Sequence, residues 1–151
     1  MAKLSTMNGG HLPVFFNIDQ NVGERCPNLP EDVALVSFLL RASANAPVLG
    51  PKTKAICMNV KITETCTPEL IQSIKDYEAA WPGTAIDAHI SVVPANTLRY
   101  ASGGTRTHTF ILAAINDDVR LGFPRIWPRI DLIQGAPPKV IQLVKRVLTG
   151  S

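Results

Sequence analysis

The sequence predicts a mainly α-helical protein with a short N-terminal β element and a C-terminal helical extension. Apolar residues recur at helical spacing in four stretches, which is the pattern of helices that bury one or more faces. Three of these stretches begin with proline or a capping threonine, which are typical helix starts. With 151 residues, of which 46% are apolar, the chain can bury a substantial core as one unit.

The first helix is predicted from Pro30 to about Ala42 and has the clearest start signal in the chain. Asn28 stands three residues before Glu31, so its side chain can cap a first-turn N–H while Glu31 reaches back to the Asn28 amide. Leu40 belongs to an apolar run that covers most of the helix circumference. We therefore expect this helix to be buried from more than one side, with the rest of the chain packed around it.

The segments on either side of this helix are predicted to be short. Residues 1–10 form a polar lead-in, and His11–Ile18 is predicted to be a strand because it is aromatic and bounded by turn residues. Pro13 has no N–H to donate, which predicts that this strand lies at a sheet edge. Ser43–Lys54 is predicted to be a loop and Ala55–Ile62 a second strand, since the latter alternates in its second half.

A second helix is predicted to begin at Pro68, with Thr67 as its cap, and to end before Pro82. One apolar stripe runs along this helix, formed by Leu70, Ile74, Tyr77 and Trp81. The polar residues 96–107 are the candidate for a mobile loop.

A third helix is predicted from about Thr107 to Val119. Prolines interrupt the segment from Arg120 to Gly135, so it cannot form one long helix. Its apolar residues must cover either the protein's own helices or a neighbouring molecule. A last amphipathic helix is predicted to start at Pro137.

Four segments follow one another along the chain: PEDVALVSFLL, CTPELIQSIKDYEAAW, AIDAHISVVP and FILAAIN. This order resembles the peptidoglycan-binding-like domain family, which has a first helix, a second helix, an Asp-Gly turn and a third helix in these places. The match covers about Val22 to Asn116. It implies a three-helix core over residues 21–119, preceded by an N-terminal segment 1–20 with its edge strand and followed by a Pro-rich extension and terminal helix, 120–151.

The chain departs from the family pattern at its polar positions. The usual Gln of the first helix is Ser37, and the usual Phe-Gln of the second is Tyr77-Glu78. The two Asp-Gly turns are replaced by Thr63-Glu64 and Asp87-Ala88. Glycine adopts a positive φ at no steric cost, so its absence predicts that these turns are rebuilt.

The sequence holds no catalytic constellation. Its three histidines are His11, His89 and His108. They form no metal-binding motif, the cysteines have no CxxC spacing, and Gly103-Gly104 lacks the lysine of a phosphate loop. We therefore expect a protein that is not an enzyme and that uses no metal and no cofactor.

Several polar and aromatic residues could contact a sugar or a peptide. They are Tyr77, Trp81, Asp87, His89, Arg99, Tyr100 and Arg106. Aromatic faces can stack on sugar rings, and the charged groups can hydrogen-bond hydroxyls. Tyr77 and Trp81 also belong to the apolar stripe of the second helix, so a place in the core is the alternative for both.

The function that the resemblance implies is a non-catalytic binding module with cell-wall peptidoglycan as its ligand. The alternative is a structural or assembly subunit of a larger bacterial or phage-related particle or of a secretion apparatus. In that alternative the self-association contacts are Phe15, Phe16, Phe123 and Trp127. The full chain would then self-associate, whereas a chain ending at Arg120 would not.

Charge and hydropathy bear on partners and location. The net charge is +3, and the basic residues after Arg120 fit a solvated helix face, so no nucleic-acid partner is expected. No apolar run reaches the ~18 residues of a membrane span, and no signal peptide is visible. We expect a protein that is cytoplasmic as synthesised, with export possible by a route that reads no signal peptide. Cys26, Cys57 and Cys66 allow at most one intramolecular disulfide, and Cys57 is expected to be buried.

Overall fold

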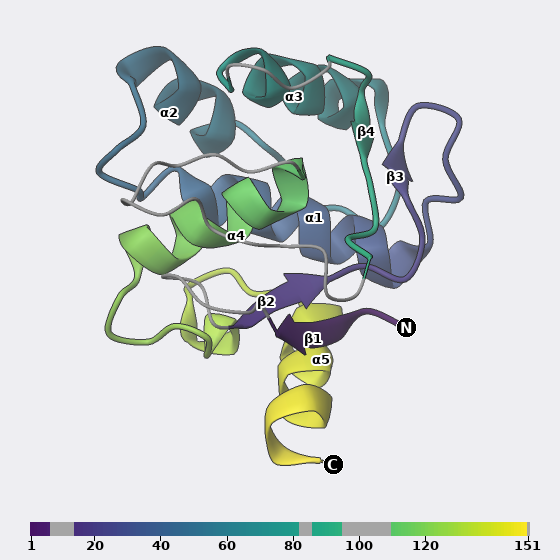
Figure 1. Ribbon diagram of the computed structural model, residues 1–151, viewed down its shortest axis with the longest axis vertical. Coiled ribbons are helices and arrows are strands. Elements are labelled where there is room, and N and C mark those ends of the chain that lie inside the picture. Colours follow the sequence, from purple (N-terminus) through teal and green to yellow (C-terminus); the bar gives the residue numbers. More distant parts are fainter. Residues whose placement is uncertain (7–13, 82–85, 95–109, 151) are drawn as a thin grey trace.

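The structure, a computed structural model, describes residues 1–6, 14–81, 86–94 and 110–150. These parts of the chain are mainly helical, as predicted (Figure 1). The helices are α1 (Pro30–Ser43), α2 (Pro51–Met58), α3 (Pro68–Ala79), α4 (Ile111–Gly122) and α5 (Pro138–Thr149), with a 3-10 turn η1 (Ile130–Leu132). The strands are β1 (Lys3–Thr6), β2 (Val14–Asn17), β3 (Val22–Gly23) and β4 (His89–Ile90). No helix in these ranges has the length and apolar character needed to cross a membrane.

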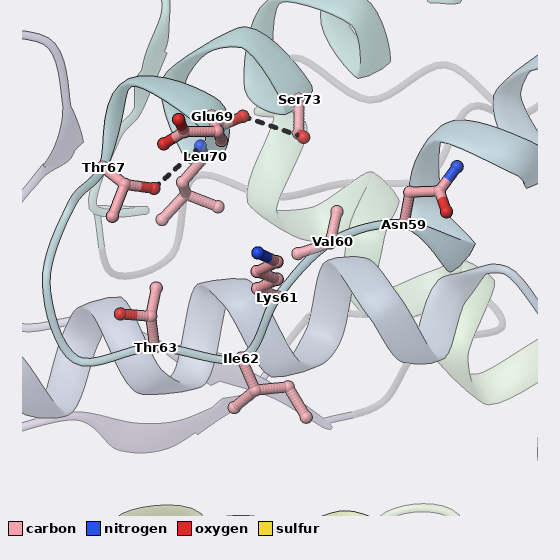
Figure 2. A pocket seen from close by; sticks show the side chains of 9 residues that line it. All are labelled: Asn59, Val60, Lys61, Ile62, Thr63, Thr67, Glu69, Leu70 and Ser73. Atoms are coloured by element: carbon pink, nitrogen blue, oxygen red, sulfur yellow. Dashed lines mark hydrogen bonds between the residues drawn. The ribbon is translucent and has the colours of Figure 1, made fainter.

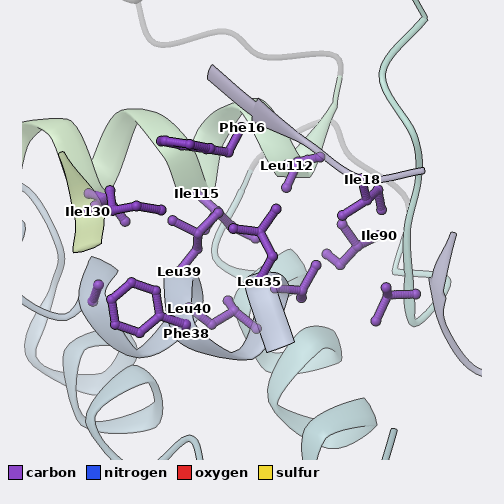
Figure 3. Packing of buried hydrophobic residues seen from close by; sticks show 14 of the residues in the cluster. Phe16, Ile18, Leu35, Phe38, Leu39, Leu40, Ile90, Leu112, Ile115 and Ile130 are labelled. Carbon is purple, nitrogen blue, oxygen red and sulfur yellow. The ribbon is translucent and has the colours of Figure 1, made fainter. Parts of the chain in front are cut away.

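Helix α1 is the centre of the fold. It lies between α2 and α3 on one side and the β1–β2 hairpin and α5 on the other, and α4 packs along it (Figure 1). Leu35, Leu39 and Leu40 are fully buried, and Figure 3 shows them among side chains from β2 and α4. The predicted start of this helix and its burial from several sides are therefore confirmed.

The predicted capping box at Asn28 is wrong. The residue before α1 is Leu29, and α1 has no side-chain cap. Asn28 lies outside the helix at φ +51°, a left-handed conformation that asparagine tolerates well. Its side chain accepts from the Gly23 N–H at 2.8 Å and donates to the carbonyl oxygens of Gly23 and Cys26. Asn28 thus closes the turn after β3 instead of starting the helix.

The N-terminal hairpin begins earlier than predicted. Residues 3–6, expected in a polar lead-in, form β1 and pair antiparallel with β2, with Leu4 opposite Phe16. The predicted strand is confirmed over Val14–Asn17, whereas His11–Pro13 lie outside the described residues.

The edge of β2 that does not pair with β1 is hydrogen-bonded to a side chain of α4. Asn116 of α4 accepts from the Phe16 N–H at 2.7 Å and donates to the Phe16 carbonyl at 3.0 Å, so it takes the place of a neighbouring strand. Phe15 and Phe16 are 2% and 0% exposed. They are core residues and not the self-association surface expected of them.

The strand predicted at Ala55–Ile62 is wrong, because Pro51–Met58 forms α2. Pro51 occupies the first turn, where it favours a helix, and only Cys57 of this short helix is buried. The alternating residues Met58 and Val60 belong to the helix end and to the link that follows it.

The other helices follow the sequence prediction more closely. Thr67 caps α3 by accepting from the Leu70 N–H at 3.1 Å, and α5 starts at Pro138, as expected. Helix α4 begins at Ile111 and continues to Gly122, beyond the expected end at Val119; residues 107–109 lie outside the described part of the chain. The expected loop at 96–107 also lies outside it.

The C-terminal extension folds back on the protein's own helices. Its buried residues belong to the same apolar cluster as α1 and are Ile130, Ile133, Val140, Leu143 and Val144. The half-buried Trp127 packs edge-on against Phe16, with ring centroids 5.7 Å apart, and Phe123 is also half-buried against the cluster. Arg146 of α5 bonds both to the Glu31 carboxylate and to the Ala2 carbonyl, which ties the extension to α1 and to the N-terminus.

Candidate functional site

A pocket of about 460 Å³ opens between the link after α2 and the first half of α3. It is lined by Asn59, Val60, Lys61, Ile62, Thr63, Thr67, Glu69, Leu70 and Ser73. Figure 2 shows the link passing beneath α3, with Glu69, Leu70 and Ser73 contributed by the helix and Lys61 by the link. A second pocket of about 470 Å³ lies where α1, α2 and the C-terminal extension meet, and its lining includes Phe38, Phe123 and Ile133.

Helix α1 fixes the link side of the first pocket. The Ser37 hydroxyl accepts from the Thr63 N–H at 3.1 Å and lies 3.2 Å from the Thr63 carbonyl. Arg41, one turn further along α1, donates to the Val60 carbonyl at 3.1 Å. The first half of the link is therefore attached to α1 at two points, and the pocket is largely formed before any ligand arrives.

The pocket has an apolar floor and a charged rim. Val60 and Leu70 are 2% and 3% exposed, and they supply the floor. Lys61 and Glu69 are exposed and place a cation and an anion on the rim. The Ser73 hydroxyl donates to the Glu69 carbonyl at 3.0 Å, which leaves its oxygen as an acceptor. Such a site suits a small ligand that carries both charges.

A second polar cluster lies at the other end of α3 and contains two of the residues predicted to bind a ligand, Asp87 and His89. Trp81 instead packs against Tyr77, with ring centroids 6.4 Å apart. Asp87 is exposed, His89 and Trp81 are half-buried, and the Asp87 carboxylate accepts from the His89 N–H at 2.9 Å. Strand β4 continues from this point and pairs with β3, where Gly23 lies opposite His89. The cluster itself is local in sequence, but its strand is held by β3, which is distant in the chain.

The remaining predicted ligand residues do not join this cluster. Tyr77 is 0% exposed, and its hydroxyl bonds to the buried Asp118 of α4 at 2.5 Å. Burial and the Asp118 carboxylate raise the pKa of Tyr77 well above its ordinary value. Tyr77 is therefore a core residue, which was the alternative for it. Arg99, Tyr100 and Arg106 lie outside the described residues.

Glu78 is a buried carboxyl at the centre of this second cluster. It is 1% exposed, and its Oε1 accepts from the Ala88 N–H at 2.9 Å. Burial, together with a hydrogen bond to the Asp87 carboxyl, raises the pKa of Glu78 to about 7. Burial opposes ionisation of Asp87 as well, but hydrogen bonds from Glu78 and from the His89 amide bring its pKa below the ordinary value. The pair therefore shares one proton below neutral pH.

The raised pKa of Glu78 makes stability depend on pH. Between pH 4.5, the ordinary pKa of a glutamate, and about pH 7, the folded state binds more protons than the unfolded state. The stability that protonated Glu78 contributes is therefore fully present at low pH and is lost as the pH rises through 7. Glu78→Gln keeps both an acceptor and a donor but cannot ionise. We expect its melting temperature to equal that of the wild type near pH 4.5 and to exceed it near pH 8.

Thermal unfolding followed by circular dichroism over this pH range measures the difference. Glu69→Gln, on the exposed side of the same helix, is the matched control and should show no such trend. A gap between Glu78→Gln and the wild type that stays constant with pH would show that Glu78 is already ionised in the fold.

The sequence prediction missed the residues of the pocket beside α3. Glu69 and Ser73 stand four residues apart and so share one face of the predicted helix, which was an available signal. Lys61 could not be placed opposite them, because its segment was predicted to be a strand. Among the described residues no group of three or more His, Cys, Asp or Glu side chains is arranged to hold a metal ion.

No family model matches the sequence, and neither a curated protein nor a solved structure does.

Proposed function

We propose that the protein is a non-catalytic binding module with a three-helix core arranged like that of the peptidoglycan-binding-like domains, and that cell-wall peptidoglycan is its ligand. The observation that carries the proposal is the pocket beside α3, where Lys61 and Glu69 place opposite charges over an apolar floor. The Ser73 hydroxyl of this pocket donates its proton to a backbone carbonyl and not to a basic side chain, which favours binding over catalysis.

Two hydrogen-bonded contacts support the proposed resemblance between this helical core and that of the peptidoglycan-binding-like domains. Ser37 and Glu78 stand where the family has glutamine, and each holds the backbone of a segment where the family has an Asp-Gly turn. Ser37 bonds to Thr63, and Glu78 bonds to the Ala88 N–H. Ala88, at a glycine position of the family, has φ +63°, the left-handed conformation that glycine adopts without cost.

The chemistry of a peptidoglycan stem peptide matches the pocket. Such a peptide has alanine methyl groups, a terminal carboxylate and often a side-chain amine. The Lys61 ammonium can bind the carboxylate and the Glu69 carboxylate the amine, while Val60 and Leu70 contact the methyl groups. A pocket of about 460 Å³ is large enough for a few residues of such a peptide.

Co-sedimentation with purified peptidoglycan sacculi tests the proposal. We expect the wild type to pellet with the sacculi and Lys61→Ala and Glu69→Gln to bind at least about tenfold more weakly, because each loses a charge-assisted hydrogen bond. Lys52→Ala, which removes the same charge from an exposed position on α2, is the control and should bind as the wild type does.

Each outcome has a definite reading. A wild type that stays in the supernatant contradicts peptidoglycan as the ligand. If the wild type and both pocket variants, Lys61→Ala and Glu69→Gln, sediment equally well with the sacculi, the ligand binds outside this pocket. Soluble fragments released from the sacculi by the purified protein would contradict a non-catalytic role.

The alternative, a structural or assembly subunit, remains a prediction, but the four aromatic residues predicted as its contacts are buried or half-buried. Phe15 and Phe16 are buried, and Phe123 and Trp127 pack against the protein's own core. A second copy could reach the two phenylalanines of β2 only after the core had opened.

A further inference from the structure

The second pocket, where α1, α2 and the C-terminal extension meet, differs from the first in its charge. The described residues that line it include two cations, Arg41 and Lys54, and no carboxylate. The rim of the first pocket instead has one cation and one anion, Lys61 and Glu69. The two pockets therefore suit ligands of different charge.

The two cations of the second pocket are not neutralised by carboxylates of the protein. Neither Arg41 nor Lys54 forms an ion pair in the part of the chain that the structure describes. Asp131, the acidic residue closest in sequence to the lining, is itself paired with Arg129 at 2.7 Å. The pocket therefore carries a net positive charge, which an anionic ligand would balance.

The guanidinium of Arg41 is held in one orientation. Its Nη1 donates to the Val60 carbonyl at 3.1 Å, and its other N–H groups have no partner among the described residues. A guanidinium held in this way suits a carboxylate, because two parallel N–H donors match the two carboxylate oxygens. Lys54 is half-buried on α2 and supplies the second positive charge.

Most of the remaining lining is apolar. Phe38 and Ile133 are 1% and 8% exposed, and the half-buried Phe123 lies beside them in the lining. Met58 is an apolar side chain that is 60% exposed, and methionine adapts readily to apolar surfaces of different shape. A ligand for this pocket should therefore have an apolar body as well as a negative charge.

One side of the pocket is attached to α1 through Asn45. The Asn45 side chain donates to the Gly122 carbonyl at 2.7 Å, which joins the end of α1 to the end of α4, just before Phe123. A Cβ at Gly122 would lie 2.9 Å from the backbone carbonyl carbon of Asn45, so glycine permits this close approach. The pocket is thus formed in the folded chain before any ligand arrives.

We propose that the second pocket is a binding site for an amphiphilic carboxylate, that is, a carboxylate joined to an apolar chain or ring. Arg41 and Lys54 bind the carboxylate. Phe38, Phe123 and Ile133 contact the apolar part. The volume of about 470 Å³ falls within the range of small-molecule sites. This site is separate from the pocket beside α3 and does not rest on the function proposed for that pocket.

Titration of the isotope-labelled full chain with octanoate and, separately, with 2-naphthoate tests the proposal. We expect at least one of them to cause a saturable shift of the amides of residues 41, 42, 44, 45, 54 and 58. The tighter of the two identifies the apolar part as a chain or a ring. Their neutral counterparts, 1-octanol and 2-naphthamide, should bind at least about tenfold more weakly, because they lack the carboxylate.

Two variants test the contribution of charge. Lys54→Ala should weaken binding of the carboxylate at least about fivefold. Met58→Glu places an anion at an exposed position of the lining and should abolish the saturable shift. The matched controls are Lys52→Ala on the same helix and Val48→Glu at a position that is 51% exposed. Neither control residue lines the pocket, so both variants should bind as the wild type does.

Three results would overturn the proposal. The first is no saturable shift with either carboxylate at millimolar concentration, or equally tight binding of the neutral counterparts. The second is equal binding by the wild type and either pocket variant, with circular dichroism showing that the variant is folded. The third is a shift confined to residues 67 and 69–73, which would place the carboxylate in the first pocket. Because no peptidoglycan fragment is present, these results do not depend on whether the protein binds peptidoglycan.

Discussion

Replacing Gly23 with alanine is expected to lower the free energy of unfolding by at least about 3 kcal/mol, a large fraction of the stability of a typical domain. Gly23 has φ +135°, and a Cβ at this position would lie 2.0 Å from the Ala88 carbonyl oxygen. That oxygen also accepts from the Glu24 N–H, so it cannot move without breaking the contact between β3 and β4. Urea unfolding followed by tryptophan fluorescence measures the loss.

Gly50→Ala is the matched control for this substitution. A Cβ at Gly50 meets no atom within 4 Å, and its φ is negative, so the change should stay within about 0.5 kcal/mol of the wild type. Equal stabilities for the two variants would mean that β3 and β4 do not approach each other as the structure has them.

Leu40→Ala is expected to lower the free energy of unfolding by about 2–5 kcal/mol, since the removed methyl groups leave a cavity in a rigid core. Leu40 is 0% exposed on the helix around which the other elements pack. The same urea titration measures the effect. Leu132→Ala makes the same chemical change at a position that is 59% exposed, and it should cost less than about 1 kcal/mol. A loss below about 0.5 kcal/mol at Leu40 would show that α1 is not the core.

Local signals account for the parts of the fold that the sequence predicts well. Pro30, the Thr67-Pro68 pair and Pro138 mark helix starts through backbone chemistry that acts within one turn. The apolar run of α1 and the stripe of α3 then show which faces are buried, because helical periodicity reads directly from the chain.

Tertiary contacts decide the parts that the sequence does not predict. Helix α2 has a weak apolar pattern and depends on packing against α1 and α3. Strand β1 is polar in sequence but finds its partner in β2, and Asn116 completes the other edge from a remote helix. Asn28 likewise closes the turn after β3, with a positive φ. Its spacing from Glu31, which predicts a capping box, carries no information about that turn.

The candidate sites show the same division. Asp87, His89 and Trp81 are close in sequence and were predicted together as ligand residues, and the structure does place Asp87 and His89 in direct contact. Lys61 and Glu69 line the same pocket, although they belong to different segments. The segment of Lys61 is held in place by Ser37, which lies on another helix and bonds to Thr63. A local pattern carries no information about such a contact.

Titration of the isotope-labelled protein with a soluble peptidoglycan stem peptide, followed by amide chemical shifts in nuclear magnetic resonance, tests the central claim most directly. The claim is that the pocket beside α3 binds the ligand. The predicted result is a saturable shift of the amides of residues 59–63, 67 and 69–73, abolished in Lys61→Ala and retained in Lys52→Ala. Shifts confined to other parts of the chain, or no saturable shift at millimolar peptide, would contradict it.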